Sequence, residues 1–144
     1  MTQSEMWTVK QAAKRLGISE HTLRYYADQG FAPSMQRDAN NRRLFNQNAL
    51  DWLQACHYLR QTGMPIKVVK HYVALCLQGN RSLQERYQLI QEQQQLAVEQ
   101  VQAAQQRLAF LNAKEKLYRE QMATNSVDTF NPNNWSRNNQ NQEC

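Results

Sequence analysis

Residues 7–33 read WTVKQAAKRLGISEHTLRYYADQGFAP, and this stretch decides the fold of the first half of the chain. Thr8 and Gln11 have the spacing of a capping box, in which a hydroxyl and an amide side chain bond to each other's backbone N–H groups. The helix that they begin ends at Gly17, and Ser19 can cap a second helix. Two short helices joined by so few residues predict a helix-turn-helix.

The second helix, which we expect to extend through Asp28, has a polar outer face. Leu23 and Tyr26 can point toward the core. The residues that can point outward are Ser19, His21, Thr22, Arg24 and Tyr25. Hydroxyls, an imidazole and a guanidinium on one exposed face suit a helix that lies in the major groove of DNA. Taken alone, the segment is equally compatible with a solvated amphipathic helix.

Residues 37–45, RDANNRRLF, predict a two-stranded hairpin after the helix-turn-helix. Asn40 and Asn41 form its expected tip, because asparagine tolerates the left-handed conformation that a tight hairpin needs. The basic residues on both sides of the tip are Arg37, Arg42 and Arg43. On a wing beside a recognition helix, arginines can clamp the adjacent phosphates or enter the minor groove. Lys14 and Arg60 complete the candidate DNA contacts.

Two further helices complete the predicted head, residues 1–80. Asn46 can cap a helix that runs to Thr62. Pro65 fits the first turn of the next helix, which ends at Gly79. The head therefore contains four short helices and a wing.

A heptad pattern follows Ser82, which can form another capping box with Glu85. Two series of period seven, offset alternately by four and three, form an a/d seam across residues 81–123. The candidate dimerisation residues are Leu83, Tyr87, Ile90, Ala97, Val101, Ala104, Leu108, Leu111 and Tyr118. Gln94 and Glu115 occupy a positions, where polar residues commonly fix the register. A helix roughly 60 Å long cannot bury its seam against so small a head, so the pattern predicts a homodimer.

The predicted fold class is all-α dominated, with a winged helix-turn-helix head followed by a long coiled-coil dimerisation helix. A tail rich in Asn and Gln, residues 124–144, is expected to be disordered because it can bury little apolar surface. The net charge is +5, and residues 1–80 carry ten basic and five acidic side chains, whereas the remainder carries seven of each. All the net positive charge thus lies in the part that would meet a polyanion.

The cysteines, Cys56, Cys76 and Cys144, are odd in number and far apart, which disfavours a disulfide framework and favours a reducing, cytoplasmic compartment. No apolar stretch is long enough for a membrane span or a signal peptide. We find no nucleophile–base pair, phosphate loop or metal-ligand spacing, so we expect neither an enzyme nor a cofactor or metal site.

The segment 7–33 followed by RDANNRRLF resembles the head of MerR-family regulators, with their helix-turn-helix, their LRYY run and their wing. The similarity covers roughly residues 6–122 and includes Trp52, Leu59, Arg60, Gly63 and Pro65. The resemblance implies a homodimer whose long helices pair antiparallel. It also implies binding to double-stranded promoter DNA with an overlong spacer, which is bent and untwisted so that RNA polymerase engages both promoter elements. The wing departs from the family at Asn41 and Arg42, where Gly-Tyr is usual.

The resemblance also bears on sensing. Metal-sensing relatives carry a Cys at the start of the dimerisation helix, where this chain has Ser82, and iron–sulfur relatives need four closely spaced Cys after it. The chain is most similar to the short aldehyde- and electrophile-responsive branch, but Tyr58 stands where that branch has its Cys. Cys56, two residues earlier, points elsewhere on the helix. It is a possible sensor, although a small buried core residue is the simpler interpretation.

Two other functions are compatible with parts of the sequence. An excisionase-like DNA-architectural factor can share the winged head, but such proteins are usually short and lack the heptad helix. A coiled-coil adaptor could use the basic head to bind an acidic protein. Salt-dependent binding to duplex DNA separates the adaptor from a DNA-binding protein.

Overall fold

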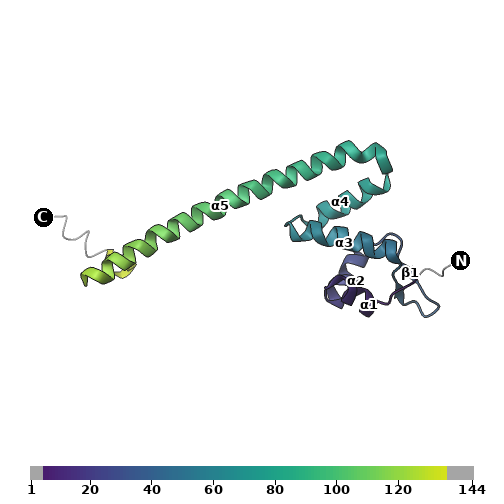
Figure 1. The fold of residues 1–144 in the computed structure, drawn as a ribbon, viewed down its shortest axis with the longest axis horizontal. Coiled ribbons are helices and arrows are strands. Elements are labelled where there is room, and N and C mark those ends of the chain that lie inside the picture. The colour runs from purple at the N-terminus through teal and green to yellow at the C-terminus, as the bar shows by residue number, and fades with distance from the viewer. Residues whose placement is uncertain (1–4, 136–144) are drawn as a thin grey trace. The chain divides into compact units, whose positions relative to one another are not determined.

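The computed structural model describes residues 5–135, which are dominated by helix (Figure 1). The elements in chain order are α1 (Val9–Leu16), α2 (Glu20–Asp28), β1 (Gln36–Arg37), β2 (Arg43–Leu44), α3 (Gln47–Gln61), α4 (Ile66–Leu77), the 3-10 helix η1 (Gly79–Ser82), α5 (Leu83–Thr124) and the 3-10 helix η2 (Pro132–Asn134). The predicted all-α dominated class is therefore confirmed. No helix in this part of the chain combines the length and hydropathy needed to cross a membrane.

The chain divides into two compact units at a point within α5, residues 1–97 and residues 98–144. The first unit contains the helix-turn-helix, the wing, α3, α4 and the beginning of α5. The second contains the rest of α5 and the segment that follows it. The sequence analysis divided the chain by expected function into a head (1–80), a dimerisation helix (81–123) and a tail (124–144). The two compact units do not test that division, which stays a prediction.

Local capping fixes the helix-turn-helix as the sequence predicted. The backbone N–H of Thr8 donates to the side-chain oxygen of Gln11 at 3.0 Å, and the N–H of Gln11 donates to the Thr8 hydroxyl at 3.3 Å. Gly17 adopts a left-handed φ of 69° after α1, a conformation that glycine reaches without steric cost. The Ser19 hydroxyl then accepts the N–H of Thr22 at 3.0 Å and begins α2. These bonds satisfy N–H groups that a helix leaves unpaired at its start.

The wing is a short antiparallel hairpin in which Arg37 pairs with Arg43. Asn41 has a φ of 62° at its tip, as predicted for a residue of the turn. The carboxylate of Asp38 accepts the backbone N–H groups of Asn40 and Arg42, both at 2.9 Å, and so holds the turn closed. The base of the hairpin is joined to the segment before α1 by a backbone bridge between Trp7 and Phe45, with both N–H···O distances at 2.8 Å.

The core of the head lies among α1 to α4 and the base of the wing. Its largest fully buried side chains include Leu23, Phe31, Phe45, Leu53, Met64 and Val69. Asn46 caps α3 by accepting the N–H of Ala49 at 2.7 Å, as predicted. Pro65 occupies the N-cap of α4, one position before the first turn that we expected.

The predicted capping box at Ser82 is wrong. The 3-10 helix η1 continues directly into α5, so the N–H of Leu83 already bonds to the carbonyl of Asn80. The buried Ser82 hydroxyl instead donates to the carbonyls of Leu75 and, at 2.9 Å, of Gly79. Ser82 thereby ties the end of α4 to the start of α5.

The first residues of the predicted seam lie beside the head, since Tyr87, Ile90 and Ala97 line a hollow together with Leu59, Thr62 and Met64. Leu89 is the buried residue of α5, and it belongs to neither seam series. The larger apolar seam residues stay exposed in the single chain, from 41% for Ile90 to 60% for Leu111. These apolar side chains therefore stay uncovered in the single chain.

A second apolar series, which the sequence analysis missed, follows Leu89 at intervals of seven residues. Its members are Leu89, Leu96, Ala103, Phe110 and Leu117. Leu96, Phe110 and Leu117 are exposed. The apolar surface of α5 is consequently wider than a simple a/d seam.

The segment after α5 folds back onto the helix. Asn125 has a φ of 50°, and the ring of Phe130 lies 4.8 Å from that of Tyr118. The Gln121 side chain donates to the carbonyl of Val127 at 2.9 Å. The disorder predicted for residues 124–144 did not anticipate this turn, which arises from one aromatic contact and several local hydrogen bonds. Residues 136–144 of the predicted tail lie outside the described residues.

Candidate nucleic-acid interface

The outer face of α2 presents several of the predicted DNA contacts to solvent. His21, Arg24 and Tyr25 are exposed, as the helix-turn-helix prediction requires. The hydroxyls of Ser19 and Thr22 are bonded to each other at 2.8 Å, and the Ser19 oxygen also caps the helix. Among the predicted contacts of α2, His21, Arg24 and Tyr25 are therefore the ones whose side chains are accessible to a ligand.

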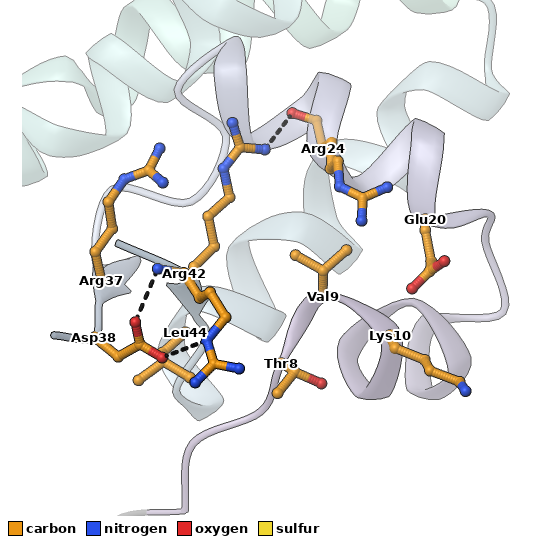
Figure 2. A pocket seen from close by; sticks show the side chains of 10 residues that line it. Thr8, Val9, Lys10, Glu20, Arg24, Arg37, Asp38, Arg42 and Leu44 are labelled. Atoms are coloured by element: carbon orange, nitrogen blue, oxygen red, sulfur yellow. Dashed lines mark hydrogen bonds and ion pairs between the residues drawn. The ribbon is translucent and has the colours of Figure 1, made fainter. Parts of the chain in front are cut away.

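A basic hollow lies between the start of α1, the outer side of α2 and the wing (Figure 2). Its volume is about 600 Å³. The lining residues are Thr8, Val9, Lys10, Glu20, Arg24, Arg37, Asp38, Arg42, Arg43 and Leu44. Five of these side chains are basic and two are carboxylates, so the hollow favours an anionic ligand.

Two of the wing arginines stabilise the turn of the hairpin and stay accessible. Arg37 donates to the carbonyl of Asn41 at 2.9 Å, and Arg42 pairs with the Asp38 carboxylate at 3.1 Å. Both arginines are exposed. The backbone N–H groups of Arg42 and Asn40 lower the pKa of the Asp38 carboxyl, because they bond to its ionised form. The wing arginines are therefore oriented without being buried.

Arg43 differs from its neighbours because it turns toward α2. Its guanidinium donates to the carbonyl of Arg24 at 3.2 Å and to the carboxylate of Asp28. Only 17% of its side chain is exposed. The sequence predicted a DNA contact here, whereas these bonds occupy the guanidinium within the head.

The other predicted contacts lie away from the hollow. Lys14 is exposed on α1, and Arg60 is partly buried near the end of α3, where it donates to the carbonyl of Met64 at 2.6 Å. Neither residue lines the hollow. Lys10 does line it, and the sequence analysis overlooked this residue. Its place in the first turn after the Thr8 cap was the available signal, because the first helix of a helix-turn-helix crosses the DNA backbone.

The candidate sensor Cys56 lies in the core. It is 1% exposed, and burial, with a smaller contribution from Cys76, raises the pKa of the Cys56 thiol to about 12. The reactive form of cysteine is the thiolate, which this environment strongly disfavours. The geometry thus favours core packing over sensing. Within residues 5–135, no group of three or more His, Cys, Asp or Glu residues is arranged to hold a metal ion.

Residues 7–76 match the family model for the MerR helix-turn-helix regulatory proteins. Over 125 residues the chain is 31% identical to an uncharacterised helix-turn-helix transcriptional regulator of Haemophilus influenzae, a match that covers 87% of this chain and 93% of the relative. The chain belongs to the MerR family. The resemblance inferred from the helix-turn-helix and wing is therefore confirmed.

Two solved structures of MerR-family regulators share the architecture. HiNmlR, a member lacking the sensor domain and solved bound to promoter DNA, is 30% identical with a TM-score of 0.68, covering 85% of this chain and 97% of that one. A regulator from Bacillus thuringiensis is 29% identical with a TM-score of 0.65, covering 79% of this chain and 100% of that one. The helix-turn-helix head and the long helix of this chain are thus a fold that other members share.

Proposed function

We propose that this MerR-family protein is a sequence-specific transcription regulator that binds double-stranded promoter DNA as a homodimer. The observation that carries the proposal is the basic hollow between α1, α2 and the wing, beside the exposed face of α2. HiNmlR, which has the same architecture, was solved on promoter DNA and supports the same use of this head.

The contacts divide into two groups in this proposal. His21, Arg24 and Tyr25 read base edges from the major groove, since they are exposed side chains of α2 that can donate to or stack on a base. Lys10, Arg37 and Arg42 bind phosphates, because they line the hollow and keep accessible charges. Lys14 and Arg60 are secondary candidates for phosphate contacts outside the hollow.

The homodimer forms through α5 in this proposal. The larger apolar seam residues are exposed in the single chain, and Leu89, the buried residue of the helix, lies outside the seam. An apolar surface of this length, rimmed by polar side chains, is typical of an interface. As the family resemblance implies, the dimer bends and untwists the promoter so that RNA polymerase engages both promoter elements. In this proposal the paired helices hold the two heads so that both bind the same face of the DNA.

The test is the salt dependence of DNA binding by the full chain. Fluorescence anisotropy with a duplex selected from genomic binding sites should give an affinity that falls linearly with log salt concentration, with a slope of several units. A scrambled duplex should bind more weakly and with a similar slope, since phosphate contacts carry no sequence information. A slope near zero would reject DNA binding and favour the alternative of a coiled-coil adaptor.

A further inference from the structure

The wing and the recognition helix α2 are connected by one partly buried side chain. Arg43 projects from β2 and donates to the Arg24 carbonyl and to the Asp28 carboxylate, both in α2. The bond to the Arg24 carbonyl is 3.2 Å long, and both residues line the hollow. These partners lie 19 and 15 residues earlier in the chain, so the contact is tertiary rather than local.

The wing has few other constraints on its orientation. Each strand contains two residues, and a hairpin this short is marginally stable by itself. The Trp7–Phe45 bridge fixes its base, whereas Arg43 fixes its side toward α2. The last turn of α2 contains no basic residue, and the Arg43 guanidinium supplies a positive charge near the end of the helix where the dipole favours one.

We propose that Arg43 and Asp28 form a positioning contact that sets the distance between the wing and the recognition helix. In this proposal Arg43 is not itself a DNA contact, and Asp28 is the residue that holds its guanidinium. The inference rests on the proposed DNA-binding function. Arg37 and Arg42 reach phosphates only while the wing is held at the correct place beside α2. Asp28 therefore supports DNA binding although it carries the same charge as DNA.

The direction in which one substitution changes DNA affinity tests this assignment. Asp28→Asn removes a negative charge from the DNA-binding head, so electrostatics alone predicts tighter binding. Loss of the positioning contact predicts the opposite, a weakening of about two- to five-fold per half-site, the range that an exposed ion pair can supply. Glu20→Gln is the charge control, because it removes one negative charge from the same helix and Glu20 lines the hollow. Among residues 5–135 Glu20 forms no ion pair, so this substitution should tighten binding.

The double variant Asp28→Asn, Arg43→Gln keeps the net charge of the wild type. The double variant should bind DNA more weakly than wild type, and its loss of affinity should not exceed that of Arg43→Gln alone. Its salt slope and its thermal melting temperature should equal those of wild type. Tighter binding by Asp28→Asn, parallel to Glu20→Gln, would overturn the positioning role, as would wild-type affinity of the double variant. If wild type itself shows no salt-dependent binding, the proposed function fails instead.

Discussion

Replacing Leu108 and Leu111 with aspartate should convert a homodimer into monomers without unfolding the head. In the single chain these side chains are 57% and 60% exposed, so the head does not depend on them. Fully burying a leucine contributes roughly 2 kcal/mol, so covering the exposed three-fifths contributes about 1.2 kcal/mol each. Four leucines in a dimer then contribute about 5 kcal/mol, or more than a thousandfold in Kd. The aspartates that replace these leucines would also bury charged carboxylates in the dimer interface, which destabilises the dimer further.

Sedimentation velocity at micromolar concentration measures this change directly. The matched control is Gln106→Asp with Ala113→Asp, which adds the same charges to the same stretch of α5 on the face opposite the seam. The control should remain dimeric, and both proteins should keep their helical circular dichroism. A monomeric wild type, or equal dissociation of both variants, would refute the assignment of the seam.

Three further results are expected. Arg37→Gln should weaken binding to all sequences about equally and lower the salt slope by about one unit per protomer, measured by anisotropy; an unchanged slope contradicts a phosphate contact. Cys56→Ser should leave the response of a promoter reporter to formaldehyde unchanged, because the buried thiol stays protonated; induction lost only in the variant contradicts this. The Asp38 carboxyl should titrate below 3.8 by NMR. Its stabilisation of the wing is therefore present above the ordinary pKa and lost as the pH falls through the lowered value; a midpoint at or above 3.8 contradicts it.

Features set by neighbouring residues could be predicted from the sequence. The caps at Thr8, Ser19 and Asn46 involve partners three residues away, and each formed as expected. The left-handed Asn41 follows from the same local reasoning. The length of α5 also agrees with the heptad pattern, because that pattern extends without Gly or Pro from residue 83 to the end of the helix.

Features that depend on distant partners could not be predicted in the same way. Arg43 was predicted as a DNA contact from its place in the hairpin, and nothing in that segment indicated its bonds to Arg24 and Asp28. Ser82 had the spacing of a cap, but its hydroxyl bonds to Leu75 on the preceding helix. Phe130 lies in a segment of low apolar content, where its ring packs on Tyr118 and hydrogen bonds such as that from Gln121 to Val127 hold the turn. In each case a tertiary partner overrode a local pattern.

The contacts around α2 connect the proposed base-reading and phosphate-binding groups into one unit. The Tyr26 hydroxyl lies 3.0 Å from Nδ1 of His57 on α3, so the inner face of α2 is anchored to the core. On its other side Arg43 attaches the wing. If the head binds DNA in this conformation, the wing and α2 cannot adjust independently to the groove, and the DNA must supply the deformation. A head of this kind would select promoters by their deformability as well as by their bases, which is the property that a regulator acting through promoter distortion requires.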